Sequence, residues 1–324
     1  MTEADEMRRQ MEPVSGALRA YFAPVDRVRE LATVFDPSRE FALDAPPAPW
    51  VDLGWVSDVQ RSATTKMESV RTGAKAMAKL QFRTMNEARV TLEFREWGKL
   101  QMALAAGSQH MNVLASDEGG TARAAGSVAL AAVPLATGST ASELFLDTNG
   151  LTGFNAGDLV AVDVDYTQQT GYVGSGIAGA YVADPSKNNY DADYVRRVTF
   201  NVGRVAEKTT NSLKLQQPLL GGTPASSARA QKVLGFVDRE GASFLQEWSA
   251  LFVMPEVSGG RICFYYPRLA AGGPAEERVT EMASPYRVAA LRASFVALPW
   301  EDETDGEPVV CYRSFFPASG SAMY

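Results

Sequence analysis

Several stretches of this chain alternate between apolar and polar residues, and this period of two constrains the fold more than any other feature. In AGDLVAVDVDY, Val160, Val162 and Val164 are expected to point inward, while Asp163 and Asp165 point outward. Such alternation is typical of a half-buried β-strand, because successive side chains point to opposite faces of a sheet. Short alternating strands separated by turn residues predict a mainly β protein.

The first coherent block, residues 50–107, combines strands with one helix. AKAMAKLQFRT and ARVTLEF alternate, and the polar stretch SATTKMESVRTG before them is typical of a long hairpin or loop. In REWGKLQMALAAG the period changes, since Trp97, Leu100 and Leu104 lie at i, i+3 and i+7. Gly107 suits the residue that follows the end of a helix. One amphipathic helix is therefore expected beside the strands.

The N-terminal segment, residues 1–44, is charged and is interpreted as an arm. Its one apolar run contains Leu18, Tyr21 and Phe22 at helical spacing before Pro24. This run predicts either a short helix or a segment that lies on a neighbouring molecule.

Residues 143–222 form a second block of short strands and predict an inserted small antiparallel β-barrel or sandwich. Residues 119–142 and 223–232 are rich in small residues and are interpreted as linkers. Strand patterns return after them, so a discontinuous core domain is expected from residues 45–118 and 233–324.

Gly174, Gly176 and Gly179 spell G-x-G-x-x-G, the fingerprint of a dinucleotide-binding turn. That motif binds a pyrophosphate only between a buried strand and a helix. Here a polar stretch precedes the glycines, and Pro185 with several turn formers follows them. A loop of the inserted domain is therefore predicted, without a nucleotide site.

The residue types do not supply a recognisable catalytic or metal site. His110 is the only histidine and lies near no nucleophile motif, while Cys263 and Cys311 stand in apolar surroundings. These three residues cannot build a zinc site at their separations. The stretch DTNGLTG lacks the acidic pattern of a calcium loop, so it is interpreted as a polar turn. We expect no catalytic, cofactor-binding or metal-binding residues. The imidazole of His110 is expected to be packed or at the surface, and the two thiols are expected to be buried and free.

The charge balance restricts the possible partners. The formal net charge is -7, whereas proteins that grip nucleic acid are usually basic over the binding face. The sequence shows no secretory signal and no apolar run of about 18 residues, so no membrane segment is expected. Folding in a reducing cytoplasm is the corresponding expectation.

The order of these patterns resembles a bacteriophage major tail protein, the subunit of the tail tube. The resemblance rests on PWVDLGWVSDV, the polar Thr-rich loop, two alternating strands, the lone helix in FREWGKLQMALAAG, and then ALFVMPEV, ICFYYPRL and a C-terminal strand pair. It covers residues 45–115 and 233–317. It implies a β-sandwich core flanked by one α-helix, with the second block as an inserted decoration.

The resemblance also implies a function, partners and a location. The subunits would form stacked rings, expected to be hexameric, that make the tail tube through which DNA is ejected into the host. Tape measure, terminator and sheath proteins would be partners, and DNA would pass through the lumen without specific binding. The protein would belong to the virion tail after assembly in the host cytoplasm.

The long polar loop is implied to reach a neighbouring subunit. The candidate interface residues are Lys66, Met67, Glu68, Arg71 and Gly73, which offer both apolar and charged contacts.

The alternating strand that follows this loop carries a basic face. Lys75, Lys79 and Arg83 on that face are expected to meet carboxylates of a neighbour. An acidic or neutral lining of the bore is expected as well, because each phosphate that a cation neutralises would hold the DNA back.

Two other interpretations stay open. One is a fibre-like or other tail protein whose inserted domain binds a surface. The other is an enzyme of unrecognised type, with a site around His110 and acidic residues.

Overall fold

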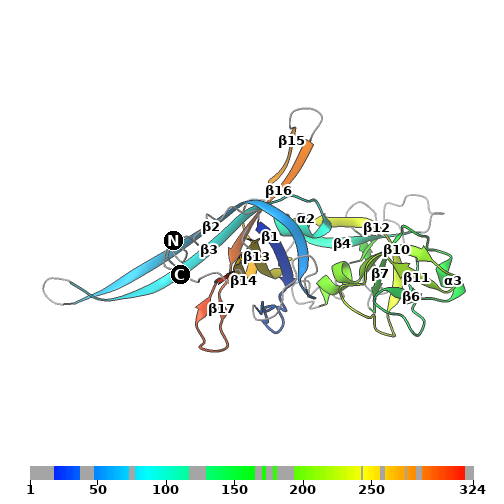
Figure 1. The fold of residues 1–324 in the computed structure, drawn as a ribbon, viewed down its shortest axis with the longest axis horizontal. Helices are drawn as coiled ribbons and strands as arrows, with labels where there is room; N and C mark the ends of the chain where they lie inside the picture. The colour runs from blue at the N-terminus through cyan, green and yellow to red at the C-terminus, as the bar shows by residue number, and fades with distance from the viewer. Residues whose placement is uncertain are drawn as a thin grey trace, which may run out of the picture.

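In the computed structural model, the chain is mainly β with antiparallel sheets, as the sequence predicts. Figure 1 shows an elongated molecule with a central body, a lobe at one end and hairpins that project from the body. The structure describes residues 18–36, 47–72, 77–116, 129–164, 170–172, 178–180, 193–241, 244–255, 260–273, 276–281 and 287–317.

An eight-stranded sheet forms the body, in the order β15-β16-β3-β2-β1-β13-β14-β19. An additional pairing joins β14 to β16, so the strands from β16 through β3, β2, β1, β13 and β14 form a closed circuit. Closure gives each of these strands a partner on both sides. The strands of this sheet are β1 (Leu18–Pro24), β2 (Val51–Thr72), β3 (Met77–Phe94), β13 (Glu247–Pro255), β14 (Arg261–Ala271), β15 (Glu276–Glu281), β16 (Arg287–Ala297) and β19 (Tyr312–Phe316).

The main core lies inside this circuit and follows the period of two. Val90, Leu92 and Phe94 of β3 are all buried in it, as alternation requires. Phe22 of β1 packs edge-on against Phe252 of β13, with ring centroids 5.9 Å apart. Inward-pointing residues of several strands therefore share one apolar cluster.

Strand β1 corrects the interpretation of the N-terminal run as a helix or an arm. It pairs with β2 on one side and with β13 on the other. Phe22 points into the main core, while Tyr21 packs in a second cluster with Leu251 and Val253 on the other face of the sheet. A strand buried on both faces shows a continuous apolar run, which periodicity cannot distinguish from a buried helix.

Helix α2 (Lys99–Ala106) confirms the one predicted amphipathic helix. Leu100 and Leu104 are buried in the main core, and Gly107 ends the helix with φ 63°, a left-handed conformation that favours glycine. Trp97, expected on the same apolar face, precedes the helix and is exposed.

A second antiparallel sheet forms the lobe, in the order β6-β11-β10-β7-β12-β4-β9-β8, and β5 pairs with β12. Strand β12 pairs with β7 through its first half and with β4 through its second half. Its elements are β4 (Gln109–Leu114), β5 (Val133–Pro134), β6 (Glu143–Phe145), α3 (Thr148–Leu151), β7 (Leu159–Asp163), β8 (Thr170–Tyr172), β9 (Ala178–Ala180), the π-helical turn η3 (Arg196–Phe200), β10 (Val202–Lys208), β11 (Ser212–Leu215) and β12 (Arg229–Arg239).

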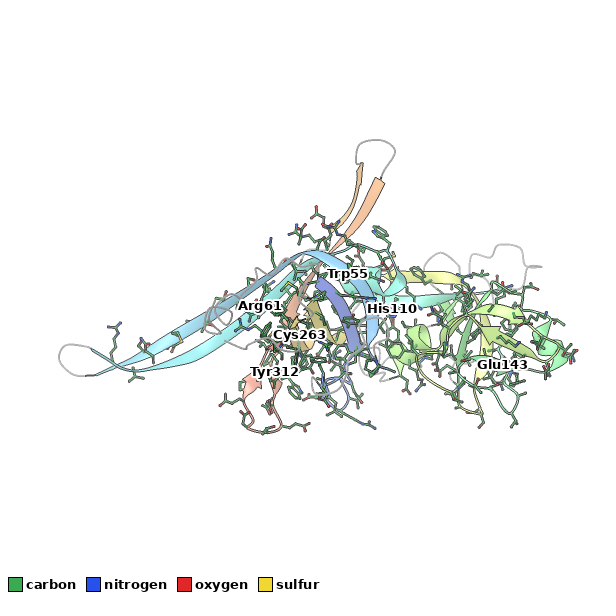
Figure 2. All side chains as sticks on the ribbon, in the orientation of Figure 1. Trp55, Arg61, His110, Glu143, Cys263 and Tyr312 are labelled. Carbon is green, nitrogen blue, oxygen red and sulfur yellow. The ribbon has the colours of Figure 1, made fainter. Side chains whose placement is uncertain are left out.

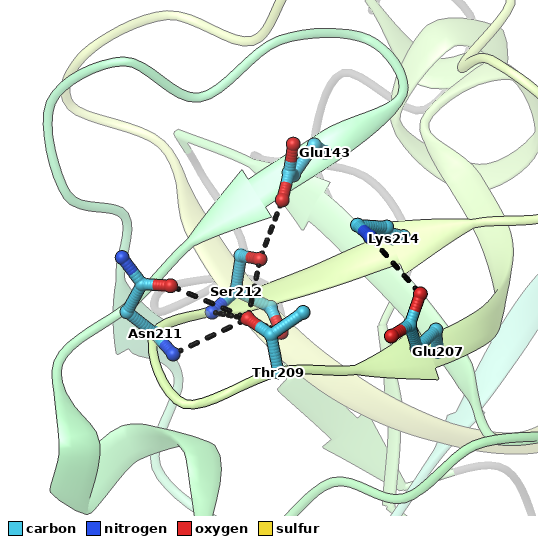
Figure 3. A network of polar contacts seen from close by, with 6 residues as sticks. All are labelled: Glu143, Glu207, Thr209, Asn211, Ser212 and Lys214. Carbon is cyan, nitrogen blue, oxygen red and sulfur yellow. Dashed lines mark hydrogen bonds and ion pairs between the residues drawn. The ribbon is translucent and has the colours of Figure 1, made fainter.

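Polar side chains tie the outer strands of the lobe together (Figure 3). Ser212 Oγ donates to Glu143 Oε1 at 2.6 Å, and the hydroxyls of Thr209 and Ser212 lie 2.7 Å apart. Lys214 and Glu207 form an exposed ion pair of 3.0 Å on the neighbouring strands. The lobe thus has its own apolar cluster and its own hydrogen bonds and ion pair between strands.

Asp163 corrects the expected alternation of β7. It is expected to face solvent, but it is buried and accepts hydrogen bonds from Arg196 and Asn201. Arg196 belongs to η3, within a stretch whose sequence pattern indicates a strand. A local π-helical turn thus places a cation beside the carboxylate, which compensates for its burial.

The boundaries of the lobe differ from the predicted linkers. Residues 229–232 of the second predicted linker lie in β12, and β5 lies in the first. Within the predicted insertion, Tyr194 and Val198 pack in the main core cluster of the body. Part of the inserted span therefore belongs to the body.

The described part of the glycine fingerprint lies in a pair of antiparallel strands. Gly179 in β9 pairs with Gly171 in β8, whereas Gly174 and Gly176 lie outside the described residues. An antiparallel pair does not offer the strand-to-helix turn that a pyrophosphate needs. The calcium-like stretch forms α3, with Asp147 accepting a hydrogen bond from the Gly150 amide at the start of that helix.

Candidate assembly interface

The stretch predicted as a long hairpin or loop is a hairpin. Strands β2 and β3 pair antiparallel from Val56 and Phe94 in the body to Thr72 and Met77 near the tip. Figure 1 shows this hairpin extending far from the body. The part of the hairpin nearest the body contributes buried side chains to the main core, and the distal part is a two-stranded ribbon.

The distal part of β2 is exposed up to Arg71. Every side chain from Gln60 to Arg71 on β2 is exposed, whereas Val56 on the same strand is buried. Figure 2 shows Arg61 close to the point where the hairpin leaves the body. A two-stranded ribbon in water is marginally stable by itself, because it buries little apolar surface. The ribbon is therefore a surface that gains stability when something packs on it.

The structure places the predicted interface residues along this ribbon. The Lys66 and Glu68 side chains are 64% and 52% exposed, with 3.6 Å between Nζ and Oε1. Met67 is 51% exposed, and Arg71 is exposed near the tip. Gly73 lies outside the described residues. The ribbon thus presents a large apolar side chain and two opposite charges at three consecutive positions of β2.

Irregularities in the ladder shape the ribbon. The register of β2 against β3 shifts between Ser57 and Gln60, between Lys66 and Met67, and again just before Arg71. Such bulges bend a strand and increase its twist. They also discourage indiscriminate pairing of exposed edges, as do lysines on an edge. The ribbon is consequently suited to side-chain contacts more than to extension of a sheet.

His110, the residue considered for an enzyme site, lies between the body and the lobe (Figure 2). It is buried, and its Nε2 lies 2.9 Å from the Thr199 hydroxyl oxygen. Burial, followed by the charge of Lys99, lowers the pKa of this imidazole well below its ordinary value. A neutral imidazole held by a hydroxyl and packed against Tyr194 at 5.1 Å fills a structural position.

Lys99 is a buried titratable group that the sequence does not point out. Its ammonium donates to Asn112 Oδ1 at 3.1 Å and to the Val198 carbonyl oxygen. Burial lowers its pKa to about 7. A cleft of about 240 Å³ lies nearby, and its wall includes His110 and the C-terminal half of α2 but not Lys99. The lysine thus joins the body to the lobe, and its amine does not face that cleft.

The thiols and carboxylates of the described residues show no further centre. Burial raises the pKa of the Cys263 thiol to about 11, and Cys311 is a half-buried free cysteine with a raised pKa as well. Among the described residues, no group of three or more His, Cys, Asp and Glu side chains is placed to hold a metal ion. In the same part of the chain, no helix has the length and apolar character needed to cross a membrane.

Comparison with known proteins leaves the family open. No protein-family model matches the sequence, and no curated protein is similar to it.

Proposed function

We propose that this chain is a self-assembling structural protein, and that the assembly is the tail tube of a bacteriophage. The observation that carries the proposal is the distal β2–β3 ribbon, on which every described side chain from Gln60 to Arg71 is exposed. A ribbon of this length with exposed apolar side chains is stabilised when a neighbouring copy covers it. The resemblance to major tail proteins supports the same arrangement, in which this hairpin crosses to the next subunit.

In this proposal the copies form rings that stack into a tube. The interface is heterologous, because the hairpin of one copy meets a different surface of the next copy, and such an interface closes into a ring or continues as a filament. DNA would pass through the bore without specific binding, in keeping with the net charge of -7.

Electron microscopy of the purified full-length chain tests the proposal. Negative-stain images are expected to show rings or tubes at micromolar concentration. A protein that stays monomeric at every concentration up to the millimolar range would contradict self-assembly.

Shortening the hairpin tests the role of the ribbon. Ala63 and Ala88 face each other in the ladder, so residues 64–87 can be replaced by a short Asn-Gly turn that preserves the register below them. We expect a folded monomer that no longer assembles, measured by light scattering and microscopy.

A matched control uses the exposed ion pair of the lobe. The variant Glu207→Gln with Lys214→Gln removes opposite charges from a surface outside the ribbon. It is expected to assemble like the unmodified protein. Tubes of normal length from the shortened variant would remove the ribbon from the interface.

A further inference from the structure

A groove lined by aromatic side chains lies on the body near the β17–β18 hairpin. Strand β17 (Trp300–Glu301), which pairs with β18 (Pro308–Val309), contributes Trp300 to the groove, whose volume is about 240 Å³. Tyr265 and Tyr312 stack in its wall with ring centroids 5.9 Å apart and an interplanar angle of 19°. The lining residues are Val34, Phe35, Tyr265, Trp300, Asp302, Tyr312 and Ser314.

The edge of this groove is strongly acidic. Residues 301–307 read EDETDGE, which is five carboxylates in seven residues without a cation. Asp302 is the one that enters the groove, and Tyr312 donates its hydroxyl hydrogen to Asp302 Oδ2 at 2.5 Å. That hydrogen bond lowers the pKa of Asp302 below its ordinary value, which favours the negatively charged carboxylate. The other four acidic residues are exposed, and no ion pair within the described residues engages this turn.

The distal β2–β3 ribbon is complementary to the groove in both charge and apolar character. Residues 64–86 contain five Lys or Arg and one Glu, a net charge of 5 − 1 = +4 in a chain whose net charge is -7. Lys66 and Met67 are consecutive residues of β2, and both are exposed. A Lys or Arg side chain over the face of Trp or Tyr gains a cation–π attraction, and a carboxylate beside it adds an ion pair.

The two surfaces do not meet within one molecule. Figure 1 shows that β2 and β3 leave the body in a direction that leads away from β17. We propose that the basic ribbon of one copy docks in the aromatic groove and against the acidic 301–307 turn of a second copy. This inference rests on the proposed self-assembly and names the surface that receives the hairpin.

Charge reversal by complementation tests this docking. Variant A carries Lys66→Glu, Arg71→Glu, Lys79→Glu and Arg83→Glu on the ribbon, which changes the net charge of residues 64–86 from +4 to 1 − 5 = −4. Variant B carries Glu301→Lys, Glu303→Lys, Asp305→Lys and Glu307→Lys beside the groove, which changes the net charge of residues 301–307 from −5 to 4 − 1 = +3. Each variant alone brings like charges together, so the concentration needed for assembly is expected to rise at least tenfold. In an equimolar mixture, the acidic ribbon of A meets the basic groove of B, and the basic ribbon of B meets the acidic groove of A. The mixture is therefore expected to assemble near the unmodified concentration.

Cross-linking of the unmodified protein gives an independent measurement that does not depend on any variant. A carbodiimide joins a lysine to a carboxylate only when the two are in contact. Peptides that link residues 64–86 to residues 301–307 are expected in assemblies, and they are expected to disappear at 1 M salt, where charges a few ångströms apart are screened. Circular dichroism and thermal unfolding verify that both variants fold.

The outcomes separate this inference from the proposed function. Assemblies that resist both reversals and yield no such cross-link would overturn the docking and leave self-assembly standing. Cross-links from the 301–307 turn to another segment alone would also overturn the docking. An unmodified protein that neither assembles nor cross-links would overturn both.

Discussion

At the scale of single residues, Lys99 links the stability of the protein to pH. Its pKa is about 7 in the folded protein, against 10.5 for an ordinary lysine such as the unfolded chain presents. Between these values the unfolded chain binds a proton that the folded chain does not, so the free energy of unfolding rises with pH from about 7 to 10.5. The shift corresponds to about 5 kcal/mol at most.

The variant Lys99→Met isolates this effect. We expect the rise in stability between about pH 7 and 10 to disappear in the variant, as measured by urea unfolding at several pH values. The control Lys214→Met removes an exposed lysine, so it retains the rise. Equal pH profiles for Lys99→Met and the unmodified protein would show that Lys99 is charged and solvated in the folded state.

Asp163 provides a second test at this scale. Its carboxylate is 1% exposed and accepts hydrogen bonds from Arg196 and Asn201. Asp163→Ala leaves these donors without their acceptor, so we expect the lobe to lose about 2–4 kcal/mol of stability. Glu207→Ala, on an exposed strand, is expected to cost under about 1 kcal/mol. Calorimetry that found equal small costs for both would contradict the structural role of Asp163.

The burial of these residues could be predicted from the sequence only in part. Alternation correctly places Val160 and Val162 inside. It fails at Asp163 because the compensating Arg196 comes from a turn 33 residues away, which no local pattern reveals. For His110 the sequence allows a packed or an exposed imidazole, and the structure shows the packed alternative. The sequence does not reveal that Lys99 is buried, because its burial depends on the packing of η3 against the start of α2.

At the scale of elements, β1 is the strand on which the body depends. Phe22 is fully buried and contacts Phe252 and Phe295. The variant Phe22→Ala is expected to cost about 3–5 kcal/mol in urea unfolding. An arm that only lies on a neighbour would tolerate the change, so a cost below about 1 kcal/mol would contradict the central position of β1.

The elements are unevenly predictable from the sequence, for physical reasons. Helix α2 is predictable because its period and its terminal glycine agree. Strand β1 is not, because both its faces are buried and its apolar run has no alternation. The polar half of β2 is compatible with either a hairpin or a loop, because SATTKMESVRTG lacks an apolar face. The structure explains that composition by the exposure of every side chain from Gln60 to Arg71 on this strand.

At the scale of the whole molecule, the lobe is joined to the body through η3. Replacing residues 143–222 with a Gly/Ser linker removes Tyr194, Val195, Val198 and Phe200 from the main core. We expect the melting temperature of the body to fall by about 10 °C or more, because several buried apolar side chains are lost at once.

A second replacement separates the lobe from this contact. Two linkers in place of residues 143–191 and 202–222 retain the segment that packs in the body. The melting temperature of the body in this variant is expected to be close to that in the unmodified protein, and the variant is expected to assemble. Equal melting temperatures for the two replacements would show that the η3 segment contributes little to the body.

The continuity of β2 and β3 from the core to the tip has a mechanical consequence. When a long polymer is stretched or bent, the force acts on the contacts between its subunits. A pull on the ribbon acts along two strands that are wedged into a closed circuit, with β1 beside one and β16 beside the other. The load therefore acts in shear on many hydrogen bonds at once, instead of peeling them apart one after another. In the proposed assembly, a connection built in this way would transmit force between neighbouring copies without a hinge at the point where the ribbon leaves the body.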